Sequence, residues 1–480
     1  MEWRRGRDYA SQLTGKSSAG TFIADLDDQD GKYASFNTSS AIVTAGGSIV
    51  PGLLTIVQML TPVVETLWAG YLVSIIPIRG ANGERLARLI GTGPLGKIGE
   101  KKIKALTYAN LTTTAAFGYI LDDADFPNRY IYATGLTTMT LWYVRNRLVI
   151  DALHDVEETE GGFIWETKDF SIAFENRTRR LTATRHVVSQ ATFSDAAGSA
   201  RTYRKPEQED PMFNVFNEFR AGVQRYTTQA LAVLWTCTDI GDQSPFIFAG
   251  QSQTFIAQYP TPGATNGDDA VLAWTTPVAT TDFTVNTAAD GTGTNLTTSI
   301  GVAVVKASNE MRITLTNNHA SLGVYVTFLQ ARGTRLSKLD LSLAIASDTP
   351  SQDIYGLREW PAPAPFIPTL QEAQDYCNRN LAIYKDPAPI VSIEVIGNRD
   401  NTHMTEVAER DIGDRITLVA DGNAKLGINQ DFFIENEHHM VEPGLHRVVW
   451  GLSPVSGSAS AGLFWTLGTS ALGTETALAY

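Results

Sequence analysis

The sequence predicts a mainly β, multidomain chain of the α+β class, and three observations support this prediction. The 480 residues are enough for roughly three domains of ordinary size. Short stretches rich in β-branched and aromatic residues recur between clusters of turn-forming residues. Helical spacing, in contrast, is concentrated in residues 111–160 and 369–381.

The first eighty residues are expected to be mostly strands. The stretch Thr21–Leu26 is apolar, and the cluster Asp27–Gly31 that follows it is typical of a turn. Further strands are expected at Leu53–Met59 and Leu67–Ile76. The second should end before Pro77, because proline cannot donate a hydrogen bond to a sheet.

Residues 81–180 are predicted to be a mixed α/β insert. Helical spacing with glycine or proline stops marks three stretches, Leu111–Asp123, Leu136–Val144 and Asn146–Glu160. The last carries an apolar stripe and ends in an acidic cluster (Asp155, Glu157, Glu158 and Glu160). Because acidic groups are unfavourable at a helix C-terminus, we expect that end to face solvent. Phe163–Trp165 and Phe170–Phe174 are expected to form a hairpin.

The middle of the chain differs in composition from its flanks. After a strand-rich connecting segment at 181–239, no lysine or arginine occurs between Arg225 and Lys306. Candidate strands at spacings typical of a sandwich predict an all-β insertion over residues 240–330. A surface without cations is not expected to hold phosphates.

Residues 331–455 are expected to be a second strand-rich domain. Its helix should cover Thr369–Leu381, because Thr369 can cap it and Glu372 follows three residues later. The turn Glu442-Pro443-Gly444 predicts a hairpin between Phe432–Met440 and Leu445–Leu452. Residues 456–480 are rich in serine, glycine, alanine and threonine and are expected to be an extended arm.

Charge and cysteine content exclude several classes of function. The formal net charge of −13 argues against a general nucleic-acid-binding protein, which needs a basic face. Cys237 and Cys377 are too few for a zinc ribbon, an iron–sulfur cluster or a disulfide scaffold. The N-terminal basic residues are followed by no apolar stretch, so no signal peptide is expected.

Two motifs resemble ligand-binding loops but depart from their patterns. Gly91–Ile98 fits GxGxxG and nearly fits a phosphate loop, but Ile98 stands where a hydroxyl should hold Mg²⁺. We therefore favour a flexible Gly-Pro connector. Asp25–Gly31 resembles a calcium loop, but an EF-hand register would put Leu26 at its first ligand position, which favours a turn.

Three residues of the last hairpin are the candidate metal ligands. A four-residue loop over Val441–Gly444 would place His439 opposite His446, with Glu437 on the same face. Two imidazoles and one carboxylate can bind a divalent metal. The alternative is a pair of polar strand histidines, at a subunit contact, that titrate together near pH 6.

No catalytic constellation emerges from the sequence. The chain has no GxSxG motif, and none of its many carboxylates forms a recognisable catalytic pair. We therefore expect no catalytic residue, no cofactor and no enzymatic activity.

Short motifs along nearly the whole chain resemble tail proteins of long-tailed bacteriophages. Arg4–Tyr9, the turn Leu26–Tyr33 and Pro51-Gly52 stand in the order found near the start of those proteins. The remaining motifs follow in the same order: Trp68–Tyr71, Ile120–Asp122 with Pro127, Gly161–Trp165, Phe174–Arg177, Asp353–Arg358, Ile412–Ile416, Asp431–Glu435, Trp450–Pro454 and Phe464–Gly473. The match at 353–358 is loose, because the family's serine lies at Ser351 here.

The resemblance implies a hub of the tail tip or baseplate, located in the virion. It implies barrel-like domains at both ends of the chain and a homotrimeric ring that offers six-fold and three-fold contacts. Such a ring closes the tail tube, seats the tape-measure protein and gates DNA ejection. Its implied partners are distal tail and tube proteins, tail fibres or other tip proteins, and the host envelope. DNA passes through the lumen without specific binding.

The C-terminal arm is the candidate assembly segment, with Phe464, Trp465 and Leu467 as apolar anchors on a neighbouring chain. Three alternative functions stay open: a distal tail ring, a receptor-binding or carbohydrate-binding tail protein whose sandwich binds the ligand, and a cell-wall hydrolase.

Overall fold

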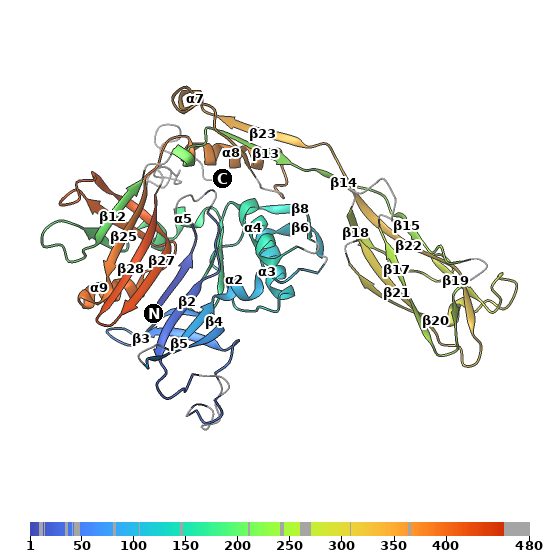
Figure 1. Ribbon diagram of the computed structural model, residues 1–480. Coiled ribbons are helices and arrows are strands. Elements are labelled where there is room, and N and C mark those ends of the chain that lie inside the picture. The colour runs from blue at the N-terminus through green and yellow to red at the C-terminus, as the bar shows by residue number, and fades with distance from the viewer. Residues whose placement is uncertain are drawn as a thin grey trace.

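The fold is taken from a computed structural model of the chain (Figure 1). The structure describes residues 1–8, 13, 15–33, 37–40, 42, 49–79, 83–104, 106–144, 147–209, 212–240, 244–259, 270–307, 309–362 and 366–455. Within these residues the chain is mostly β, as the sequence predicts, and its strands form several separate sheets. No helix in these ranges has the length and apolar character needed to cross a membrane.

One large sheet contains strands from both ends of the chain. Its main path is β12 (Arg204–Glu209), β25 (Ile390–Ile396), β28 (Leu445–Pro454), β27 (Ile428–Glu442), β1 (Glu2–Gly6), β2 (Thr21–Asp27), β5 (Arg85–Thr92), β4 (Glu65–Arg79) and β3 (Leu54–Met59). β26 (Arg415–Ala420) pairs with β27, and β11 (Thr192–Ser194) pairs with β26.

The sheet differs from the two separate barrel-like domains that the sequence resemblance implies. β1 pairs with β2 along one edge and with β27 along the other, so the two ends of the chain share a continuous sheet. Among the described strands no pairing closes this sheet into a barrel. β4 also continues through Pro77, where the strand pairs only with β5, so the missing N–H costs no ladder bond on its other side.

The mixed part of the chain packs beside this sheet (Figure 1). It contains β6 (Leu106–Thr112), β7 (Arg129–Ile131), β8 (Thr138–Val144), β9 (Phe163–Glu166) and β10 (Ile172–Glu175). Its helices are α2 (Pro94–Ile98), α3 (Thr113–Asp123), α4 (Val149–Glu160), α5 (Arg179–Thr182) and α6 (Thr184–Val187). The apolar stripe of α4 is confirmed, since Ala152, Leu153 and Val156 are fully buried, and β9 and β10 form the expected hairpin.

Two predictions for this region are wrong. Residues 136–144, predicted as helical, contain β8, in which Met139 and Leu141 are buried between exposed threonines. That alternation has the period of a strand. The acidic end of α4 is also not solvated. Glu160 is buried because it accepts hydrogen bonds from the Thr113 hydroxyl at 2.7 Å and from two backbone N–H groups, and Glu157 accepts one from Ile164 N.

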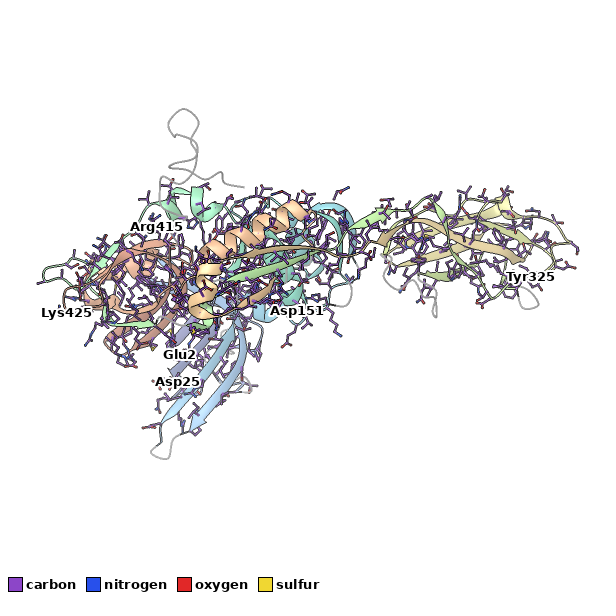
Figure 2. The ribbon with its side chains drawn as sticks, turned by 90° about the horizontal axis from the view of Figure 1, so that it is seen from above. Glu2, Asp25, Asp151, Tyr325, Arg415 and Lys425 are labelled. Atoms are coloured by element: carbon purple, nitrogen blue, oxygen red, sulfur yellow. The ribbon has the colours of Figure 1, made fainter. Side chains whose placement is uncertain are left out.

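The middle strands form two sheets around one apolar core. The first contains β14 (Tyr226–Thr228), β15 (Ala232–Thr236), β16 (Phe246–Ile247), β18 (Ala270–Trp274), β19 (Phe283–Asn286) and β22 (Val324–Lys338). The second contains β17 (Ser252–Gln258), β20 (Ile300–Lys306) and β21 (Glu310–Asn317), with the short helix η2 (Thr297–Ser299) before β20. This two-sheet unit projects away from the rest of the molecule in both views (Figures 1 and 2).

A small sheet connects this unit to the body. It consists of β13 (Glu218–Val223), β23 (Ser342–Ser347) and β24 (Glu359–Ala362), and it packs on α8 (Leu370–Tyr384). The predicted cap of α8 is confirmed, because the Thr369 side chain accepts a hydrogen bond from Glu372 N at 3.1 Å. The remaining helices are η1 (Met212–Asn214), α7 (Thr349–Tyr355), η3 (Gly397–Arg399) and α9 (Asn401–Glu409).

Candidate functional site

The first strand carries a buried arginine into the centre of the molecule. β1 places Arg5 opposite Glu437 of β27, and Arg5 Nε donates to Glu437 Oε1 at 2.5 Å. Arg5 Nη2 donates to Asp411 at 2.6 Å, and Nη1 donates to the backbone oxygen of Glu166 at 3.2 Å. One guanidinium therefore connects β1 with β9, β27 and the segment after α9.

The charges of this cluster are stabilised by each other rather than by water. Burial alone would lower the pKa of Arg5, but Asp411 and Glu437 more than offset it, so the net shift is upward. For Glu437, burial would raise the pKa, but Arg5 and His439 hold it well below its usual range. Both groups are therefore ionised in the folded chain, and each depends on its partner.

Lys168 extends the cluster through backbone oxygens. Its ammonium donates to the backbone oxygens of Ala408 at 2.6 Å and Arg410 at 2.5 Å. Burial lowers the pKa of this amine. Lys168 thus fastens the β9–β10 turn to the end of α9 through backbone contacts.

A second buried arginine, Arg180 of the short helix α5, binds β10 and β27. Arg180 donates to Glu175 at 2.9 Å and to Glu435 at 2.6 Å. The Ser453 hydroxyl also donates to Glu435, at 2.7 Å. The Arg180 guanidinium lies 3.5 Å from the ring centroid of Phe163, a cation–π distance.

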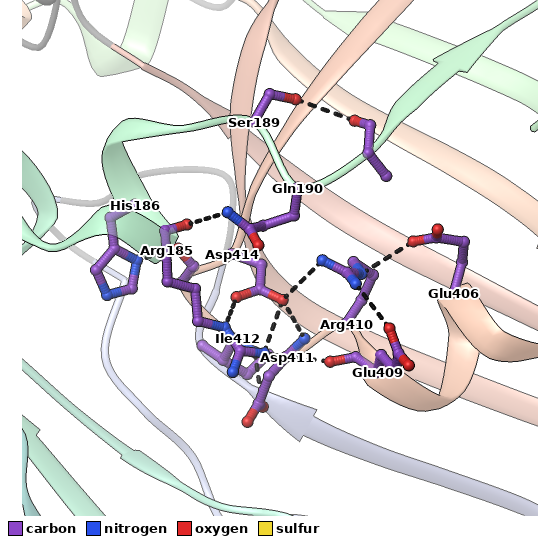
Figure 3. A network of polar contacts seen from close by, with 12 residues as sticks. Arg185, His186, Ser189, Gln190, Glu406, Glu409, Arg410, Asp411, Ile412 and Asp414 are labelled. Atoms are coloured by element: carbon purple, nitrogen blue, oxygen red, sulfur yellow. Dashed lines mark hydrogen bonds and ion pairs between the residues drawn. The ribbon is translucent and has the colours of Figure 1, made fainter. Parts of the chain in front are cut away.

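Asp414 organises the outer part of the network (Figure 3). Arg185 binds it with two nitrogens, and Asp411 N donates to it at 3.0 Å. Arg410 lies 3.7 Å from Asp414 and pairs with Glu406 at 3.0 Å. Since Asp414 is fully buried, its charge is compensated by these side chains.

The candidate metal ligands come together, but in a different register from the predicted one. The hairpin loop is only Pro443-Gly444, so His446 pairs with Val441 and His439 with Val448. The shift is two residues, which keeps both histidines on one face. His439 Nδ1 lies 3.1 Å from His446 Nε2, and His439 Nε2 lies 3.6 Å from Glu437 Oε1.

The surroundings of these three residues favour the polar-histidine alternative. Glu437 already binds Arg5, and Trp3 stacks on His439 with ring centroids 4.6 Å apart. Within the described ranges, no three histidine, cysteine or acidic side chains are arranged to hold a metal ion. Burial lowers the pKa of His439, and it lowers the pKa of His446 to about 4, so the predicted joint titration near pH 6 is wrong.

The glycine-rich segment at 91–98 binds a carboxylate of the chain itself, that of Glu166 from β9. Residues 91–98 comprise the end of β5, Gly93 and the whole of α2, so they are not a flexible connector, and β5 is antiparallel to both neighbours. The Glu166 carboxylate accepts from Leu95 N at 2.6 Å and from Gly20 N at 2.7 Å. A Cβ atom at Gly93 would lie 2.1 Å from Glu166 Oε2, so glycine is needed there for close approach.

These contacts define what we call the junction: Arg5, Glu166, Lys168, Glu175, Arg180, Arg185, Asp411, Asp414, Glu435 and Glu437. Several of its residues belong to the motifs that resemble tail proteins, including Arg5, Glu175 and Asp414. Sequence reasoning missed Glu166, Lys168 and Arg180 as members. The available signal was the density of arginines in residues 177–185, which is unusual in a chain with 19% charged residues.

The junction holds distant segments of the chain together through ion pairs and hydrogen bonds. Its carboxylates and cations are paired with one another or with backbone groups. The expected assembly residues Phe464, Trp465 and Leu467 lie outside the described residues.

Comparison with known proteins gives structural neighbours but no sequence matches. No family model and no curated protein matches the sequence. The 43 kDa tail protein of prophage MuSo2 from Shewanella oneidensis has a TM-score of 0.48 and 10% identity, over 94% of this chain and 93% of that one. A tail protein from Neisseria meningitidis has a TM-score of 0.48 and 11% identity, over 95% and 92%.

A prophage tail protein from Listeria monocytogenes has a TM-score of 0.41 and 8% identity, over 94% of this chain and 87% of that one. These structural neighbours are phage tail proteins, the class that the sequence motifs resemble.

The junction predicts that two glutamates of β27 contribute very differently to the free energy of unfolding. Glu437→Gln should lower the free energy of unfolding by roughly 3–5 kcal/mol, because it leaves buried Arg5 without one of its partners. Glu442→Gln in the same strand should cost less than about 1 kcal/mol, because Glu442 is exposed and its pair with Arg447 is solvated. Urea denaturation measures both changes, and equal effects would contradict a buried role for Glu437.

Glu166 predicts a specific pH dependence of stability. Burial raises its pKa from 4.5 to about 7, against the lowering effect of its backbone hydrogen bonds. Between these values the folded chain keeps this proton and the unfolded chain releases it, so this group makes stability fall as pH rises from about 4.5 to 7. Glu166→Gln should remove this contribution.

The measurement is the difference in melting temperature between the unmodified chain and Glu166→Gln from pH 4.5 to 8. The other titrating groups are common to both proteins and largely cancel. A difference that stays constant across this range would show that Glu166 is ionised in the folded chain.

Proposed function

We propose that the chain is a structural subunit of a phage tail tip, and that three copies form the hub ring. In this role the ring closes the tail tube, seats the tape-measure protein and gates DNA ejection. The ordered motifs of the sequence support this assignment, and the surface of the large sheet supports assembly. The observation that carries the proposal is the outer edge of β3, which no other strand of the described residues pairs with.

The two ends of the main sheet path differ in how their edges are protected. β12 carries Arg204, Lys205 and two glutamates, contains Pro206 and has an irregular register with β25. Such features discourage pairing with another chain. β3 contains no charged residue, and its side chains Leu54 and Ile56 are 53% and 50% exposed.

An exposed apolar edge strand needs a covering partner, because it would otherwise pair with other chains unspecifically. If β3 of one copy covers a different surface of the next copy, the contact is head-to-tail, and it forms a closed ring when the rotation that relates the copies is a third of a turn. Three copies are the number that the motifs imply. Part of the net charge of −13 then lines the lumen and keeps DNA from adhering as it passes.

The projecting two-sheet unit favours a second function, contact with the host surface. Tyr325 lies near its far end (Figure 2). Tyr325 packs against Phe246, with ring centroids 4.7 Å apart, and Phe246 packs against Phe248. Phe248 is 67% exposed. Exposed aromatic groups on a projecting domain suit a receptor or carbohydrate contact.

A charged residue on β3 should prevent ring formation. Ile56→Lys should leave the chain folded but shift it from trimer to monomer, because the lysine would have to be desolvated in the contact. Val305→Lys is the matched control: Val305 is 68% exposed on β20, an edge strand of the projecting unit. Sedimentation velocity gives the masses, and a monomeric unmodified chain would refute the ring.

The receptor function predicts binding by the full chain to a glycan array or to host envelope fragments. Phe248→Ser should abolish that signal without changing the melting temperature, because Phe248 is largely exposed. Retained binding by Phe248→Ser would exclude this aromatic group as the contact.

A further inference from the structure

A cleft of about 350 Å³ opens between the β3–β4 hairpin and the β7–β10 region. Gln58 and Glu65 line it from the hairpin, and Tyr130 and Tyr132 line it from β7 and the residue that follows it. Asp169 lines it from the β9–β10 turn and Asp411 from the segment after α9. None of these residues was selected by the sequence motifs. The cleft lies beside the junction but is open to solvent through its two tyrosines, which are 41% and 40% exposed.

The aromatic wall of the cleft is held in place. Tyr130 and Tyr132 lie nearly parallel, with ring centroids 5.7 Å apart, and Tyr132 also stacks on Trp165 at 5.8 Å. The Tyr130 hydroxyl donates to Asp169 Oδ2 at 2.6 Å, and the Thr167 hydroxyl donates to Asp169 Oδ1 at 2.5 Å. The rings and the carboxylate are therefore already oriented before any ligand arrives.

The charges that line the cleft favour a cationic ligand. Glu65, Asp169 and Asp411 contribute three carboxylates, and Lys168 contributes one ammonium, which is bound to the backbone oxygens of Ala408 and Arg410. Asp411 is partly neutralised by Arg5. Glu65 and Asp169 thus give the open part of the cleft an acidic character, which repels phosphates and other anions.

The chain shows that Tyr132 accepts a guanidinium. Arg179 lies 4.8 Å from the Tyr132 ring centroid, with its Nη1 donating to the Tyr132 backbone oxygen at 2.6 Å. A planar guanidinium can stack on a tyrosine face while its N–H groups bind a carboxylate. The cleft offers both kinds of group, since the Tyr130 hydroxyl is bonded to Asp169 and Glu65 lines the cleft from the β3–β4 hairpin.

The rim of the cleft is apolar and exposed. Val64, which lines the mouth, and Leu60 in the same turn are each 71% exposed. In protein interfaces a buried arginine anchor is commonly surrounded by apolar contacts that exclude water. The rim therefore suits a polypeptide partner, not a free small molecule.

We propose that this cleft binds an arginine side chain presented by a partner protein, with Tyr130 contacting the guanidinium face and Glu65 and Asp169 accepting its N–H groups. Tyr132, which already stacks on Trp165 and holds Arg179, supports the Tyr130 ring from behind. The site stands on the geometry of the cleft and does not depend on the proposed ring. It assigns a binding role to a part of the surface that the tail-protein motifs leave without one.

The test uses the purified full chain and three small probes in saturation-transfer NMR. The probes are acetyl-Gly-Arg-Gly-amide, the same tripeptide with citrulline in place of arginine, and a chitotetraose. Citrulline keeps the shape of arginine but has no charge. We expect saturation transfer to the arginine peptide, with a dissociation constant on the order of millimolar for a single side chain, and none to the other two probes.

Two variants locate the binding. Glu65→Gln should weaken arginine-peptide binding about three-fold, the effect of losing one partly exposed charge contact. Glu84→Gln is the matched control, because Glu84 is an exposed glutamate of the same sheet region and does not line the cleft. Tyr130→Leu should remove the signal by removing one ring face.

Four results would overturn the proposal: no transfer to the arginine peptide, equal transfer to the citrulline peptide, transfer to the chitotetraose alone, or equal weakening by Glu65→Gln and Glu84→Gln. Transfer to chitotetraose alone that Tyr130→Leu abolishes and Phe248→Ser leaves unchanged would identify the cleft as a saccharide site instead. Because the probes are small and act on a single chain, these results are separate from the oligomeric state of the protein.

Discussion

The pairing of buried Arg5 with Glu437 and Asp411 is the interaction on which the architecture depends. It lies where β1 is inserted between β2 and β27, the only strand in the described part of the chain that joins the N-terminal and C-terminal halves of the large sheet. A strand of five residues contributes few ladder hydrogen bonds. The buried charge contacts add specificity, since any slip of β1 would leave a guanidinium in the core without a partner.

Charge is therefore used differently inside and outside this molecule. In the junction, arginines and carboxylates are paired within a nearly dry environment, and their partners come from segments far apart in the sequence. On the surface, charges protect the β12 edge, whereas β3 and the turn after it are apolar. A surface divided in this way is typical of a subunit that must present some faces and shield others.

Elements with local signals were predictable from the sequence, and contacts between distant segments were not. The stripe of α4, the cap of α8 and the last hairpin follow from spacing and capping within a few residues. Residues 2–6 carry no such signal, because the partners that make them a central strand lie more than 400 positions away. The buried acidic end of α4 was missed for the same reason, since its donors come from Thr113 and the 136–137 backbone.

The errors also show that the face of a strand can be predicted correctly even where its register is wrong. The loop of the last hairpin is two residues shorter than expected, yet His439 and His446 still meet, because a shift of two residues preserves the face of a strand. Residues 136–144 were misread since an alternating strand with two neighbouring buried residues, Leu141 and Trp142, resembles helical spacing. The tail-protein resemblance used the order of short motifs, which does not depend on register.

The central position of β1 has a consequence for the synthesis of the chain. β1 cannot pair along its second edge until β27 has left the ribosome. For most of translation that edge of β1 is therefore open. At about 5–20 residues per second, the interval is roughly twenty seconds to a minute and a half. During that time β2 protects only one edge of β1, and Arg5 stays hydrated. The body of the protein therefore matures late, after the projecting unit has been made, and premature association of nascent chains is disfavoured while this charge remains exposed to water.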